Sequence, residues 1–200
     1  MHLQHWDALP PDQSAQSIPL LFGRTYQFPT IFPPNYLMLL GHLQAAKPDQ
    51  ALIQMVGHEF GLQSSVVAGL CSRQLQRRSL ALTHVEEQTI LDRPKPFFCQ
   101  GLAEPAQMPR FKTNGKQQKL RACVTYTAQV LTNQYTLLRE MTDLSGRDLV
   151  RATIAACDAG PEAVSHAVHQ KIEVDLVTSD QNFSADVLHR AGWFQLHGWV

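Results

Sequence analysis

The sequence has little charge and no net excess of either sign. Charged residues make up 17% of the 200 residues, whereas an average soluble protein has about 25%. Lys and Arg together number 17, and Asp and Glu also number 17. A protein that binds nucleic acid by itself is usually basic, so only local clusters of charge could support that class. The 44% of apolar residues favours a folded core and excludes a disordered chain.

Signals for membranes and secretion are also missing. No apolar run approaches the roughly 20 residues that span a bilayer. Residues 1–7, MHLQHWD, lack a basic stretch followed by an apolar one, which excludes a secretory signal peptide. We therefore expect a cytoplasmic protein without membrane contact.

Cysteine is scarce, and its spacing does not match a metal site. The four cysteines are far apart and no pair has zinc-site spacing, so we expect reduced and mostly buried thiols at Cys71, Cys99, Cys123 and Cys157. His166 and His169 could share a helix face, and no third ligand is suitably spaced. The sequence predicts no metal and no cofactor.

The N-terminal half reads as an irregular arm followed by helices. Prolines interrupt residues 1–32, whose apolar residues indicate an arm lying on the core. Apolar residues at helical spacing then predict helices over 35–46, 49–60 and 64–78. Alternation after residue 78 predicts short strands at 80–85 and 96–100.

The C-terminal half reads as a sheet with flanking helices. Residues 120–131, rich in Val, Thr and Tyr, form the clearest predicted strand, and a turn at 133–134 leads into a second strand at 135–141. Residues 147–157 fit either a helix after Ser145 or a strand, and we favour a strand. The remaining predictions are a helix at 161–170, a strand at 172–177, a helix from Ser184 to Gly192 and a strand at 193–200.

These elements predict an α+β fold. An N-terminal helical, winged-helix-like part is followed by a mainly antiparallel sheet with flanking helices. The expected organisation is an arm (1–32), a helical part (33–103) and a sheet-rich part (104–200), which could form one continuous domain.

Residues 50–78 carry the most specific pattern. A helix-turn-helix needs a small residue before its turn, a residue that tolerates positive φ in the turn, and apolar anchors on both helices. Gly57 and Gly61 supply the first two, and the anchors are Val56, Phe60, Leu62, Val67 and Leu70. The segment resembles the helix-turn-helix of bacterial regulators. The resemblance implies DNA binding, and the alternative is a plain helical corner.

Two groups of residues would make the nucleic-acid contacts. Arg and Gln side chains read guanine and adenine edges, and the second helix would contribute Ser65, Arg73, Gln74, Gln76, Arg77 and Arg78. A loop before residue 120 concentrates basic residues around an aromatic ring, a mixture that suits phosphate contacts and base stacking. Its contributors would be Arg110, Phe111, Lys112, Lys116 and Lys119, and the alternative is a solvated loop.

Catalytic signatures are absent: the sequence has no Gly-x-Ser-x-Gly, phosphate loop or Gly-x-Gly-x-x-Gly. One enzyme interpretation is a hot-dog-like acyl-thioester dehydratase or thioesterase, by analogy of fold, with His42, His58 or Glu59 as general base. A protein-interaction scaffold is another alternative.

The sequence thus predicts a non-catalytic nucleic-acid-binding protein. It would be a regulator or a subunit of a nucleoprotein complex of a mobile element or an antiviral system, and would contact DNA rather than RNA. The low charge and rich apolar content favour a homodimer or a larger protein assembly.

Overall fold

The computed structural model describes residues 21–22, 25–28, 36–81 and 116–199. The elements in this part of the chain are helical, and it contains no sheet. In chain order they are α1 (Tyr36–Ala46), the 3₁₀ turn η1 (Lys47–Asp49), α2 (Gln50–Glu59), α3 (Ser64–Ala81), α6 (Lys116–Met141), α7 (Gly146–Ala159), α8 (Pro161–His169), the 3₁₀ turn η2 (Val174–Val177) and α9 (Phe183–Leu196).

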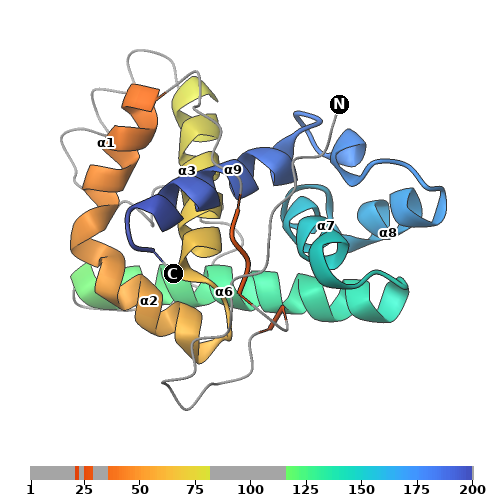
Figure 1. The fold of residues 1–200 in the computed structure, drawn as a ribbon, viewed down its shortest axis with the longest axis horizontal. Coiled ribbons are helices and arrows are strands. Elements are labelled where there is room, and N and C mark those ends of the chain that lie inside the picture. The colour runs from red at the N-terminus through yellow and green to blue at the C-terminus, as the bar shows by residue number, and fades with distance from the viewer. Residues whose placement is uncertain (1–20, 23–24, 29–35, 82–115, 200) are drawn as a thin grey trace.

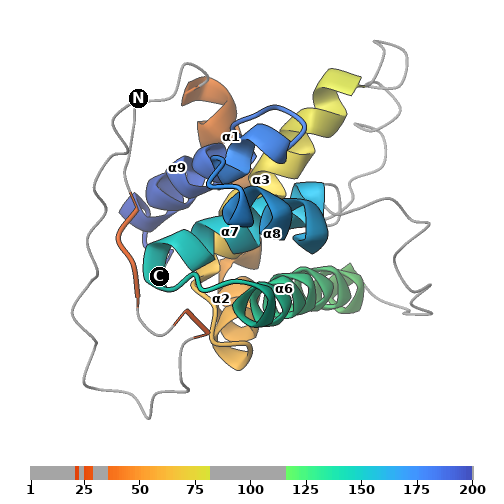
Figure 2. The same ribbon diagram turned by 90° about the vertical axis from the view of Figure 1, so that its right-hand side faces the viewer.

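The helices are arranged around a crossing of α3 and α9. Figure 1 shows α9 passing across α3, with α1 and α2 on one side and α7 and α8 on the other. The long helix α6 runs beneath these elements and contacts α2, α3 and α7 (Figures 1 and 2). This arrangement places α3 in the interior.

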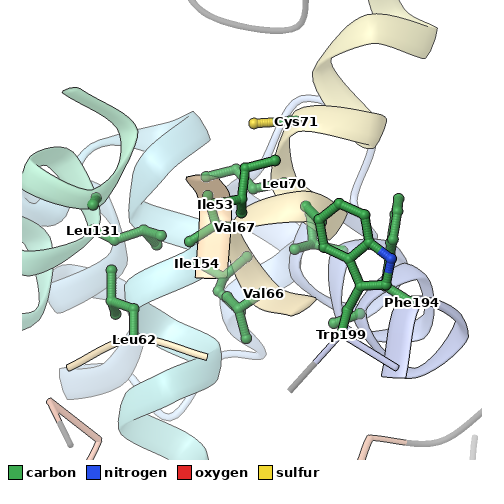
Figure 3. Close-up of a cluster of buried hydrophobic side chains, with 14 of the residues drawn as sticks. Ile53, Leu62, Val66, Val67, Leu70, Cys71, Leu131, Ile154, Phe194 and Trp199 are labelled. Carbon is green, nitrogen blue, oxygen red and sulfur yellow. The ribbon is translucent and has the colours of Figure 1, made fainter. Parts of the chain in front are cut away.

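One large hydrophobic cluster joins both halves of the chain (Figure 3). It contains Ile53 of α2, Val67 of α3, Leu131 of α6, Ile154 of α7 and Phe194 of α9, all 0% exposed. The predicted boundary at residue 103 stays a prediction, but the core draws on residues from both sides of it. A smaller cluster fills the space between α6, α7 and α8.

The crossing of α3 and α9 brings two backbones into direct contact at Gly69. A Cβ atom added to Gly69 would lie 2.7 Å from the carbonyl oxygen of Val187 and 2.9 Å from the backbone nitrogen of Ala191. Both are backbone atoms of α9, which cannot move aside as a flexible side chain can. Glycine at position 69 is therefore required for the observed separation of the two helices.

The described residues before α1, which are 21–22 and 25–28, pack on the helices, and the predicted arm over 1–32 stays a prediction. Phe22, Tyr26 and Phe28 are at most 6% exposed. The side chain of Gln63 accepts from Tyr26 N at 2.8 Å and donates to Tyr26 O at 2.9 Å. Gln195 of α9 donates to the same carbonyl at 2.7 Å and accepts from Phe28 N at 3.0 Å. The side-chain amides of Gln63 and Gln195 thus bond to the backbone of Tyr26 and Phe28, as the backbone of a neighbouring strand would.

The predicted α+β class is wrong, and α6 shows the reason most clearly. The two strands predicted at 120–131 and 135–141 are one continuous helix. Its buried residues Leu120, Val124, Ala128, Leu131 and Leu138 recur at intervals of three, four or seven, which is the period of a helix. Burial along this face outweighs the strand preference of the Val and Thr residues.

The threonines of this region are accommodated within the helical backbone. The hydroxyl of Thr127 donates to the carbonyl of Cys123 at 3.1 Å, and that of Thr132 donates to Ala128 at 2.8 Å. Such bonds to the preceding turn satisfy a hydroxyl that would otherwise compete with the helix.

The other predicted strands of the C-terminal half are also wrong where the structure describes them. Residues 147–157 lie in α7, whose apolar face includes Leu149, Ala152 and Ala156. Residues 172–177 end in the turn η2, and residues 193–196 continue α9 through Gly192. Alternation over six or so residues was too short to separate a strand from a helix.

Most of the predicted helices agree with the structure. Those over 35–46, 49–60, 64–78 and 161–170 are confirmed as α1, α2, α3 and α8. The strand predicted at 80–85 begins within the last turn of α3, and its remainder and the strand predicted at 96–100 lie outside the described residues.

Changing Gly69 to Ala tests the crossing, and Gly41→Ala in α1 provides the matched control. A Cβ atom at Gly41 would meet nothing within 4 Å. Because alanine has a higher helix propensity than glycine, the Gly41→Ala variant should be about 1 kcal/mol more stable. Gly69→Ala should instead destabilise by about 2 kcal/mol, because α3 and α9 must separate. Urea unfolding measures both free energies, and a Gly69→Ala protein as stable as the Gly41→Ala protein would contradict the backbone contact.

Candidate functional site

The predicted helix pair has the expected local geometry. Gly61, between α2 and α3, has a positive φ of 64°. A Cβ atom at Gly57 would lie 2.9 Å from the carbonyl oxygen of Leu62, and Leu62 N bonds to Gly57 O at 2.7 Å. A small residue is therefore required at position 57, as the pattern predicted.

The second helix of this pair is an interior helix over residues 64–73. Ser65 is 0% exposed and Arg73 is 7% exposed. The helix packs against α2 and α9, so these two predicted DNA contacts face the protein interior. Interior packing also explains why the exposed polar face expected of a recognition helix is missing from this stretch.

Arg73 belongs to an ion network between α3 and α9. Its Nη2 atom lies 2.7 Å from Asp180 Oδ2, and its Nε lies 3.1 Å from Asp186 Oδ2. Its guanidinium also lies 5.9 Å from the ring centroid of Phe183. Asp186 bonds to Arg190 at 2.9 Å, so two arginines share this carboxylate. Pairing of this kind is what makes burial of Arg73 tolerable.

A serine and a histidine extend the network towards α1. The hydroxyl of Ser72 accepts from Arg190 Nη1 at 2.8 Å and lies 2.9 Å from His42 Nδ1. Because that hydroxyl accepts from the arginine, its own proton is available for His42. Burial, and then the charge of Arg190, lower the pKa of His42 to about 4. Burial also lowers the pKa of Arg190, and Asp186 opposes this change. His42 is therefore neutral at physiological pH.

Gln74, the next residue of α3, has a different environment. Its carbonyl oxygen Oε1 is buried and accepts no hydrogen bond from any residue that the structure describes. A buried acceptor without a partner costs about 1–3 kcal/mol and calls for an explanation, such as local strain or contact with a water, an ion or a ligand. Among the other predicted contact residues, Ser65 Oγ and Arg73 Nε are also buried without a hydrogen-bond partner in the described structure, although Arg73 Nε lies 3.1 Å from Asp186 Oδ2.

The other predicted site residues are not brought together by the described structure. Gln76, Arg77 and Arg78 lie in the last turns of α3, and Lys116 and Lys119 lie in the first turn of α6. Arg110, Phe111 and Lys112 lie outside the described residues.

The alternative catalytic candidates occupy separate places. His58 and Glu59 are exposed at the end of α2, where Glu59 pairs with Arg121 at 3.0 Å, whereas His42 lies in the interior network. Cys71 and Cys123 are buried and Cys157 is half-buried, all as free thiols, and Cys99 lies outside the described residues. Burial, and then Asp158, raise the pKa of Cys157 to about 12, which leaves no thiolate for nucleophilic chemistry at neutral pH.

A second ion cluster holds the start of α9. Asp175 is 2% exposed and accepts from Ser184 N at 2.7 Å, Ala185 N at 3.1 Å and Arg151 Nη2 at 2.9 Å. Arg151 also pairs with Glu173 at 2.8 Å. The carboxylate satisfies the free N–H groups of the first turn of α9 and so caps the helix.

Sequence reasoning missed both ion clusters. The pair Asp186–Arg190 has the i, i+4 spacing that could have indicated a charged helix face. The partners Arg73–Asp180 and Arg151–Asp175 are far apart in the sequence, and no local pattern identifies them. Within the described ranges there is no group of three or more metal-ligating side chains, and no described helix is long and apolar enough to cross a membrane.

His42 predicts a pH dependence of stability. Its pKa is about 4 when folded and about 6.5 when unfolded, so the unfolded chain binds more protons between these values. The free energy of unfolding should therefore fall as pH is lowered from about 6.5 to 4. His42→Gln should flatten this part of the curve in urea unfolding at several pH values, since both proteins share all other titrating groups. Identical slopes for the two proteins would contradict the neutral, buried His42.

Comparison with known proteins overturns the predicted function. A model of the family Lysozyme g matches residues 41–198, and no curated protein matches the chain. The match extends from within α1 to residue 198, whereas the helix-turn-helix resemblance covered residues 50–78 alone. The predictions of a DNA-binding helix-turn-helix, a nucleic-acid partner, a hot-dog enzyme and a scaffold are therefore wrong. The chain belongs to the lysozyme g family.

Proposed function

We propose that this protein acts on peptidoglycan, as a muramidase that hydrolyses glycosidic bonds of the glycan strand. The observation that carries the proposal is the family match over residues 41–198, which includes all the helices of the described core except the first turn and a half of α1. The match concerns the whole helical architecture and not one motif.

Hydrolysis of a glycosidic bond sets a clear chemical requirement. A carboxylic acid must protonate the leaving oxygen, and a second carboxylate usually acts as base or nucleophile. The acid works best in apolar surroundings without a cationic partner, because such surroundings keep its proton in place near neutral pH.

The buried Asp175 and the half-buried Asp186 already serve the fold. Asp175 caps α9 and bonds to Arg151. Asp186 is shared by Arg73 and Arg190. Each of these groups has at least one arginine partner within 3.1 Å, so neither offers an unpaired acid to a substrate.

Gln74 favours a second candidate function, which is binding of peptidoglycan without hydrolysis. Its Oε1 is a buried acceptor with no partner among the described residues, and a sugar hydroxyl could donate to it. An amide has no proton to give at neutral pH, so at this position the chain could hold a glycan but could not protonate it.

Isolated bacterial cell walls distinguish the two functions. Co-sedimentation measures binding, and newly formed reducing sugar ends measure hydrolysis. Sedimentation together with reducing ends supports the muramidase. Sedimentation without reducing ends supports the binding protein, and the absence of both results contradicts action on peptidoglycan.

The variant Gln74→Glu tests whether position 74 faces the glycan. Burial without an ionic partner raises the pKa of a carboxyl group, so glutamate here should act as a general acid and increase the release of reducing ends at least about tenfold. Gln74→Met, which has a similar shape and no acid, is the matched control and should show no increase. Equal release by both variants, with both folded by circular dichroism, would show that position 74 is remote from the reacting bond.

A further inference from the structure

The helices α7 and α8 and the turn η2 contribute to a cavity whose lining includes neither Gln74 nor the residues of the α3–α9 ion network. Its volume is about 400 Å³, near the lower end of the range for small-ligand pockets. The apolar part of its wall comes from Leu144, Val168, Ile172 and Val174. All belong to the loop after α6, to α8 or to the segment that follows α8, which Figure 1 shows on the side of the molecule away from α1.

Two of the charged residues at this cavity, Arg151 and Glu173, pair with each other. Arg151 and Glu173 form an ion pair at 2.8 Å, and Arg151 also bonds to the buried Asp175. They form a fixed polar edge because their positions are set by the capping of α9.

The other two charged residues at the cavity are unpaired. The side chains of Asp148 and Lys171 make no hydrogen bond or ion pair with the residues that the structure describes. One carboxylate and one ammonium group thus line a largely apolar pocket. Such a pocket complements a ligand that carries both charges and an aliphatic portion.

The backbone of Lys171 is held in an uncommon conformation. Its φ is 58°, a left-handed value that costs a residue with a side chain about 1 kcal/mol. Ile172 N bonds to Ala167 O at 2.9 Å and closes the end of α8. Glycine would suit this position better, so the fold places a lysine at the cavity despite the strain.

We propose that this cavity binds a short peptide that carries both an ammonium and a carboxylate group, with Asp148 facing the ammonium and Lys171 facing the carboxylate. The aliphatic part of the peptide contacts Val168 and Val174. The inference rests on the proposed function, because peptidoglycan carries short peptides with such groups on its glycan strands, and this site would contact the peptide while the glycan lies elsewhere.

Isothermal titration of the full chain with the free tripeptide alanyl-γ-glutamyl-lysine tests the site. We expect saturable binding at millimolar concentrations that weakens with added salt. Asp148→Asn and Lys171→Gly should each weaken binding about threefold to fivefold, the effect of losing one exposed ion pair. Glu162→Gln, which removes the acidic residue of the first turn of α8, is the matched control and should leave binding unchanged.

Lys171→Gly also separates a lost contact from a lost fold. Glycine relieves the left-handed strain, so the melting temperature should stay the same or rise while binding weakens. The same peptide with acetylated amino groups and amidated carboxylates should bind more weakly than the charged form.

Two results would overturn the proposal: absence of binding at low salt, or binding that neither Asp148→Asn nor Lys171→Gly weakens. The free tripeptide contains no glycosidic bond, so this experiment is independent of the cell-wall assay. Peptide binding with no action on cell walls supports the cavity and contradicts the proposed muramidase. Action on cell walls with no peptide binding does the reverse.

Discussion

The backbone contact between α3 and α9 at Gly69 is the constraint on which the rest of the structure depends. It draws α3 into the interior, where Val66, Val67 and Leu70 are almost fully buried. Polar residues on the same helix then need partners inside the protein. Ser72 and Arg73 find them in Asp180, Asp186 and Arg190 of α9 and the segment before it. The close crossing of α3 and α9 therefore requires the ion network, because the crossing buries the polar residues that the network pairs.

Local signals in the sequence were sufficient for the N-terminal helices and insufficient for the C-terminal half. The glycines at 57 and 61 and the apolar spacing of 49–78 identified α2, α3 and the turn between them. In α6 the residue types indicated strands, whereas the spacing of Leu120, Val124, Ala128 and Leu131 indicated a helix. Spacing proved the better guide, because tertiary burial of one face outweighs weak intrinsic preferences.

The function was misread because a buried charge resembles a binding charge in the sequence. Arg73 carries the chemistry of a base contact, but its carboxylate partners come more than a hundred positions later. Their proximity follows from the tertiary fold alone. Gln74 was also predicted as a base contact from its residue type. What distinguishes it in the structure is its environment, in which its Oε1 is buried without a partner among the described residues. The expected cytoplasmic location stays a prediction.

The two glutamines that hold the N-terminal arm have a consequence for the order of folding. Tyr26 is bonded by Gln63, which lies 37 positions later, and by Gln195 of α9, which lies 169 positions later. A ribosome therefore releases Tyr26 and Gln63 well before Gln195. Tyr26 can gain its contacts with Gln63 early, but its bond to Gln195 forms only once α9 has been synthesised and has packed in place.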